Sequence, residues 1–196
     1  MFVIACAIAL LCCLAVSHSA PLTCEDLVRP LDQLDPRHLG GKWALVAGSL
    51  SHLPYLERFK QRDSASINVA SNSSDTHISY TRSLRLDNKC KYSSYNITLE
   101  GSNFTYDGTD KSNLSASFVH TSCRDCMLMH MTVESGKRHH LYLFSRRRQL
   151  EQKEMEEFSA QVECLNLLPP VVMDPTKELC PEETAGDPAA QTEGET

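Results

Sequence analysis

The stretch Leu39-Gly40-Gly41-Lys42-Trp43 lies directly before a run of β-prone residues, and Trp43 is the only tryptophan of the chain. From Lys42 to Ser145 the sequence continues as short β-prone runs separated by Gly, Asn, Asp and Ser. This spacing is typical of an up-and-down antiparallel barrel or sandwich. The runs predict eight strands, at residues 42–50, 64–70, 76–86, 91–100, 103–107, 113–121, 126–134 and 139–146.

Four Asn-x-Ser/Thr sequons predict N-glycosylation, at Asn72, Asn96, Asn103 and Asn113. A glycosylated asparagine must face solvent, and successive side chains of a strand point to opposite faces. Asn96 on the outside therefore places Tyr95 and Ile97 on the inside. The same argument at the later sequons makes Tyr106 and Phe118 inward-facing. In residues 76–86 the same alternation places Tyr80 and the charged Arg82 on one face.

The chain divides into three parts. Residues 1–20 begin with an uncharged apolar run and end in small polar residues, as in a signal peptide, so we expect a secreted, extracellular protein. Residues 21–183 form one domain, and residues 184–196 form an acidic tail that we expect to be disordered. The net charge of −6 comes almost wholly from residues 174–196, which leaves no basic field for nucleic acid or for a membrane surface.

After the eighth strand the pattern changes. Apolar residues between Gln149 and Leu165 recur at the spacing of one helical face, which predicts an amphipathic helix. Pro169 and Pro170 end this pattern, and the Val171–Met173 segment could add a short strand.

Six cysteines remain after the signal peptide is removed: Cys24, Cys90, Cys123, Cys126, Cys164 and Cys180. An even number fits complete pairing in an oxidising compartment. Cys123 and Cys126 form a C-x-x-C motif, for which a redox or a zinc role is possible. We expect a structural disulfide instead, because redox C-x-x-C motifs lie at a helix start after a strand and zinc would need further ligands.

A Gly-x-Trp strand, seven further strands and a C-terminal helix in this order resemble the lipocalin family. The resemblance implies an all-β fold: an eight-stranded up-and-down antiparallel barrel with one C-terminal α-helix packed outside. It also implies structural roles for Gly41 and for Trp43, which closes the barrel floor. A basic residue after the eighth strand, Arg146 or Arg147, would pack on the indole as a cation on an aromatic face.

Several segments narrow the resemblance to the orosomucoid and apolipoprotein M branch of lipocalins: Pro21–Cys24, Gly41–Trp43, Glu157–Leu165 and Lys177–Glu182. Fish plasma lipocalins that bind tributyltin or tetrodotoxin are built on the same template. By analogy, Cys24 pairs with Cys164 and Cys90 pairs with Cys180. Cys123 and Cys126 are then left to pair with each other.

The resemblance implies a blood-plasma carrier that reversibly binds a lipid, steroid, organotin or toxin-like molecule in its barrel. The candidate ligand contacts are Tyr55, Ile67, Tyr80, Arg82, Tyr95, Ile97, Tyr106, Phe118, Leu128, Tyr142 and Phe144. The register of the family favours Leu128 and His130 as inward residues over the alternating methionines beside them. Arg82 replaces an acid of orosomucoid, which favours a neutral or anionic amphiphile; an internal salt bridge or a solvated rim position is the other interpretation.

Other function classes find little support in the sequence. It contains no catalytic serine motif or phosphate loop, so we expect no enzyme and no cofactor. His120, His130 and the pair His139 and His140 lack the spacing of metal ligands, so we expect no metal. We also expect a monomer with no stable membrane insertion. The alternative function is a glycan-bearing, immunomodulatory protein-binding module whose barrel is only a scaffold.

Overall fold

The computed structural model describes residues 22–182, except for 33, 71–75 and 111–112. The predicted signal peptide, the predicted acidic tail and the sequon at Asn72 therefore lie outside the described residues.

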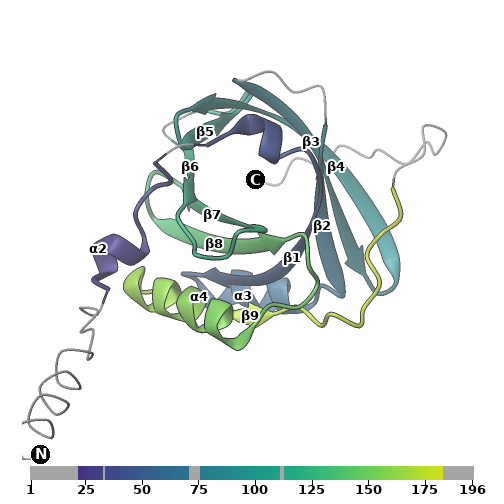
Figure 1. Cartoon of the computed structure of the whole chain (residues 1–196). Helices are drawn as coiled ribbons and strands as arrows, with labels where there is room; N and C mark the ends of the chain where they lie inside the picture. The colour runs from purple at the N-terminus through teal and green to yellow at the C-terminus, as the bar shows by residue number, and fades with distance from the viewer. Residues whose placement is uncertain (1–21, 33, 71–75, 111–112, 183–196) are drawn as a thin grey trace, which may run out of the picture.

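The core of the molecule is a closed antiparallel barrel, seen along its axis in Figure 1. Its strands are β1 (Gly41–Leu50), β2 (Ser64–Val69), β3 (His77–Leu86), β4 (Lys89–Glu100), β5 (Asn103–Tyr106), β6 (Leu114–Val119), β7 (Cys126–Val133) and β8 (Arg138–Ser145). Neighbours in the chain pair in order, and β1 pairs with both β8 and β2, which closes the sheet. The predicted up-and-down barrel is confirmed, and each predicted strand overlaps one observed strand.

Tight turns hold the pairing register. Asp87 and Asn88, between β3 and β4, have φ values of 48° and 60°. Positive φ at both central residues matches the twist of antiparallel strands, and Asp and Asn tolerate it better than most side chains. The β3–β4 ladder consequently runs without interruption from His77 opposite Thr98 to Leu86 opposite Lys89.

The helix α4 (Gln152–Cys164) packs on the outside of the barrel, beside β1 in Figure 1. Glu151 and Glu154 form a capping box that begins the helix. Phe158 and Val162 are 1% and 2% exposed, and they belong to a second group of buried residues, here called the outer cluster. Its members are Ala47, Val119, Leu128, Leu141, Leu143, Phe158 and Val162. The predicted helix and the short strand β9 (Val171–Val172), which pairs with β1, are both confirmed.

Among the described residues, three short helical elements were not predicted: α2 (Cys24–Leu27), η1 (Pro36–His38) and α3 (Leu53–Lys60). The helix α3 has only 8 residues and buries only Leu56 and Phe59, which is too short a segment to show a helical repeat. Phe59 packs directly on β1, where a Cβ added to Gly48 would lie 2.5 Å from the Phe59 Cζ atom. No helix among the described residues is long and apolar enough to cross a membrane.

All three predicted disulfides are present. Cys24–Cys164 joins α2 to α4, and Cys90–Cys180 joins β4 to the C-terminal segment. In the chain-entropy model, closing loops of 140 or 90 residues stabilises a fold by about 5 kcal/mol each. Cys123–Cys126 spans a sequence separation of only 3, for which the same model gives about 2 kcal/mol.

Candidate ligand-binding interior of the barrel

A large group of buried apolar side chains, here called the inner cluster, receives at least one member from every barrel strand. One from each strand, in order from β1 to β8, is Leu45, Ile67, Ile78, Ile97, Phe104, Phe118, Met129 and Phe144. Tyr80 is also buried, and Tyr95, Tyr106 and Tyr142 pack against the cluster while partly exposed. These side chains make the barrel interior apolar, with hydroxyl groups at a few points.

Three tyrosines from adjacent strands form a connected group, here called the tyrosine trio: Tyr80, Tyr95 and Tyr106. The rings of Tyr80 and Tyr95 stack with centroids 5.3 Å apart, and Tyr106 meets the ring of Tyr95 edge-on at 5.6 Å. The Tyr80 and Tyr106 hydroxyl groups are hydrogen-bonded at 2.7 Å. Burial raises the pKa of both phenols, that of Tyr106 to about 12, so both keep their protons at neutral pH. One proton fills the mutual bond, and the other is available to an acceptor on a ligand.

Arg82 brings a positive charge to the tyrosine trio. Its guanidinium carbon lies 5.3 Å from the centroid of the Tyr95 ring, and the residue is partly buried. Among the described residues no carboxylate lies within salt-bridge distance of Arg82. An internal salt bridge, which was one interpretation of Arg82, is therefore not present among the described residues.

A second polar group gathers around His140 and Tyr142 of β8. The His140 Nδ1 atom lies 3.3 Å from the Tyr142 hydroxyl. Burial, followed by the nearby charges of Arg138 and Arg62, lowers the pKa of His140 to about 4. The ring is therefore neutral at pH 7. The local positive charge comes from the two arginines, of which Arg138 also pairs with Glu134 at 2.7 Å.

Tyr55, unlike the other candidate ligand contacts, lies on a helix and not on a barrel strand. It belongs to α3, is 37% exposed, and holds the Arg138 guanidinium 4.1 Å from its ring centroid. The Arg62 guanidinium lies over Phe59 of the same helix, at 4.7 Å. Two arginines thus pack on the aromatic side chains of α3.

The prediction that Leu128 and His130 face inward is wrong. Leu128 is 1% exposed and belongs to the outer cluster beneath α4, whereas Met127 and Met129 belong to the inner cluster. His130, on the same face as Leu128, stacks on His139 with centroids 5.5 Å apart. Because α4 covers the outside of β7, both faces of this strand are apolar, and alternation alone could not assign them.

The barrel floor is built as predicted, with Arg146 as the basic residue. Its guanidinium lies 3.7 Å from the centroid of the Trp43 ring and donates hydrogen bonds to the carbonyl oxygens of Lys42, His38 and Gly40. Gly41 has a φ of 89°, and a Cβ there would lie 3.0 Å from Arg146. A side chain at this position would therefore disturb the arginine as well as strain the backbone.

Several inward residues are absent from the candidate ligand contacts. Phe104, which the sequon at Asn103 indicates as inward, is 1% exposed in the inner cluster. Met127, Met129 and Met131 lie on the same side. The alternation of the methionines is compatible with an inward face, but the register of the family favoured Leu128 and His130 instead.

A closed eight-stranded barrel with a tryptophan floor under an arginine and a helix packed outside defines a lipocalin. The comparisons agree with this class. The family model described as "ApoM domain" matches residues 22–183, so the chain belongs to this lipocalin family. A search of curated proteins gave no match.

Two solved structures illustrate the likeness in fold. The siderocalin Ex-FABP, described as functioning through dual ligand specificities, is 13% identical with a TM-score of 0.62, covering 75% of this chain and 97% of its own. Lipocalin 12 from rat epididymis, solved by NMR, is 16% identical with a TM-score of 0.63, covering 82% of this chain and 93% of its own. At these identities the comparison supports the fold alone.

Proposed function

We propose that this protein is a secreted plasma carrier that reversibly binds a small hydrophobic or amphipathic molecule, such as a lipid, steroid, organotin or toxin-like compound, inside its barrel. The observation that carries the proposal is the inner cluster, to which every barrel strand contributes an apolar side chain. Burying ligand surface against such a lining stabilises a complex by about 25 cal/mol per Å². No covalent step is needed for capture or release.

The polar groups of the interior favour a neutral or anionic head group. Arg82 lies beside the tyrosine trio without a carboxylate partner among the described residues, and Arg62 and Arg138 add positive charge near His140. An anion would meet a guanidinium and a phenol proton there. A cationic ligand would have to bring its charge close to these arginines in a region shielded from water, which is unfavourable.

Displacement of a fluorescent probe tests the carrier function. The probe is 8-anilinonaphthalene-1-sulfonate, displaced by fatty acids, steroids and organotin compounds. Phe144→Ala removes an inner-cluster ring and should weaken probe binding about tenfold, given the apolar area lost. Its matched control is Leu143→Ala, the next residue of β8 but in the outer cluster, which should leave the affinity unchanged. Equal effects of both variants, or no saturable binding, would reject binding in the barrel.

The head-group preference needs a separate comparison. A long-chain fatty acid and the corresponding alcohol have the same apolar tail and differ in charge. Arg82→Gln should weaken the acid about tenfold and leave the alcohol nearly unchanged. Arg85→Gln is the control, since Arg85 lies on the same strand with its guanidinium 3.6 Å from Glu178. An unchanged ratio of acid to alcohol affinity in the Arg82 variant would argue against an anionic preference.

A second candidate is an immunomodulatory protein-binding module that carries glycans. It is favoured by the exposure of Asn96, Asn103 and Asn113, which lie on or next to the neighbouring strands β4, β5 and β6. Native mass spectrometry of protein purified from its source separates the two candidates. A co-purifying small molecule supports the carrier. The module is supported if the protein captures another protein in a glycan-dependent way and no ligand displaces the fluorescent probe.

A further inference from the structure

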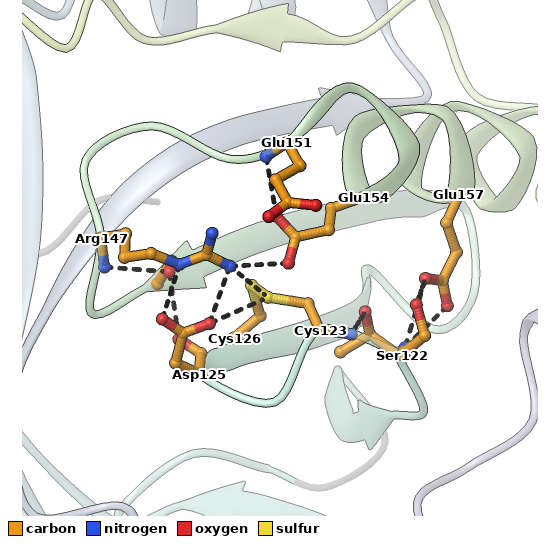
Figure 2. The surroundings of a disulfide bond; sticks show 10 residues. Ser122, Cys123, Asp125, Cys126, Arg147, Glu151, Glu154 and Glu157 are labelled. Atoms are coloured by element: carbon orange, nitrogen blue, oxygen red, sulfur yellow. Dashed lines mark hydrogen bonds and ion pairs between the residues drawn. A yellow bond between two sulfur atoms is a disulfide. The ribbon is translucent and has the colours of Figure 1, made fainter.

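A charged network surrounds the Cys123–Cys126 disulfide, in the turn between β6 and β7 (Figure 2). The Arg147 Nη2 atom lies 3.4 Å from the Cys123 sulfur, and an Asp125 carboxylate oxygen lies 3.3 Å from the same sulfur. Arg147 also pairs with Asp125 and with Glu154 of α4, each at 2.6 Å. We propose that this disulfide is a thiol–disulfide exchange site, which a small dithiol reductant opens while the barrel stays folded.

The fold can tolerate an open Cys123–Cys126 bond. It closes a far shorter loop than the other two disulfides, and the turn has several other attachments. The Cys126 amide donates to the Cys123 carbonyl, and the Ser145 hydroxyl and Arg146 amide both donate to the Asp125 carbonyl at 3.0 Å. Ser122 is hydrogen-bonded to Glu157 of α4 (Figure 2). The two thiols would therefore stay close together and could re-form the bond.

The surroundings favour attack on one of the two sulfur atoms. Cys123 is 5% exposed, whereas Cys126 is more accessible, so a reductant thiolate attacks the Cys126 sulfur. The sulfur–sulfur bond breaks, and its electron pair goes to Cys123, where Arg147 faces the developing negative charge. Cys123 then takes a proton from water. The second thiol of the reductant then attacks the reductant sulfur that is bonded to Cys126. This step releases Cys126 as a thiolate and leaves the reductant with an internal disulfide.

The charges near Cys123 have opposite effects on this step. The Arg147 hydrogen bond lowers the pKa of the Asp125 carboxyl, so Asp125 is ionised and opposes a Cys123 thiolate while Arg147 favours it. Glu154 is the other carboxylate on Arg147, and its pKa is lowered in the same way. Removing Arg147 should therefore slow opening, and neutralising Asp125 should accelerate it.

An equilibrium titration tests whether this disulfide opens separately. The full chain is equilibrated with graded mixtures of reduced and oxidised dithiothreitol, quenched in acid, alkylated and mapped by mass spectrometry. The expected result is a range of mixtures in which Cys123 and Cys126 are alkylated, the other four cysteines are protected, and the near-UV circular dichroism is that of the folded protein. Opening of all three disulfides together, or opening of Cys24–Cys164 first, would overturn the proposal.

Kinetics of opening in two variants test the mechanism. Arg147→Gln should slow opening by about three- to tenfold, and Asp125→Asn should accelerate it by a similar factor. If the substitutions merely loosened the turn, the disulfide would open faster in both variants. Faster opening in both variants would therefore overturn the role of Arg147. A brief pulse of glutathione should leave its adduct on Cys126, and an adduct on Cys123 would reverse the assigned direction. None of these results depends on a ligand in the barrel.

Discussion

At the scale of single residues, Arg146 shows how one side chain can close an open end of a barrel. Its guanidinium covers the Trp43 ring and donates to three backbone carbonyls, two from the segment before β1 and one from the start of β1. Arg146→Met should lower the free energy of unfolding by about 2–3 kcal/mol, because the cation–π contact and the charged hydrogen bonds are lost together. Arg146→Lys should recover less than half of the loss, since an ammonium group lacks the planar fork of donors. Guanidinium chloride unfolding measures both, and full recovery by lysine would contradict this account.

His140 should make stability depend on pH. Its pKa of about 4 in the folded chain lies below its ordinary value of 6.5, so the unfolded chain takes up the proton first as the pH falls. The stabilisation is complete above pH 6.5 and is lost as the pH falls toward 4. Between pH 8 and pH 5 the loss should be on the order of 1–2 kcal/mol.

A histidine variant can isolate this contribution. His140→Gln should flatten the fall in unfolding free energy between pH 8 and pH 5. His130, whose pKa is lowered by burial and by His139, should account for a further part of the fall. A His140 variant with the same pH profile as the parent chain would show that the ring does not titrate as the structure indicates.

At the scale of elements, α3 can lie close against the barrel because Gly48 of β1 has no side chain. A Cβ at Gly48 would lie 2.5 Å from Phe59 and 3.0 Å from Tyr142. Gly48→Ala should therefore push Phe59 outward, at a cost of about 1–3 kcal/mol from overpacking. Hydrogen exchange should become faster in Leu53–Lys60 and stay unchanged in β5 and β6. Uniform acceleration across the barrel would mean that α3 is not the element displaced.

The sequence predicted those elements whose two faces differ in polarity. The sequons fixed the outward side of β4, β5 and β6, and the structure leaves Asn96, Asn103 and Asn113 exposed. On β7 the same reasoning failed, because α4 gives the outer face an apolar cover and Leu128 is as buried as the methionines beside it. The helix α3 was missed because it buries only two side chains, and its position depends on a close approach to β1 that no local pattern encodes.

At the scale of the whole molecule, the barrel wall is covered unevenly. The strands β1, β6, β7 and β8 carry the inner cluster on one face and the outer cluster on the other, beneath α4. The exposed sequon asparagines lie on or next to β4, β5 and β6, and of these strands only the described residue Val119 belongs to the outer cluster. Stability and ligand binding should therefore depend on different sets of side chains, although both sets belong to one closed sheet.

Phe158→Ala tests this separation. The ring is 1% exposed between α4 and the barrel, and its removal should lower the free energy of unfolding by about 3–5 kcal/mol. Because the outer cluster does not line the interior, the Kd for the fluorescent probe should change less than twofold under conditions where the variant is folded. Phe144→Ala should show the opposite pattern. It should weaken probe binding more than Phe158→Ala does. If Phe158→Ala weakens the probe as much as Phe144→Ala does, the helix must hold the interior in its binding shape, and the two clusters act as one core.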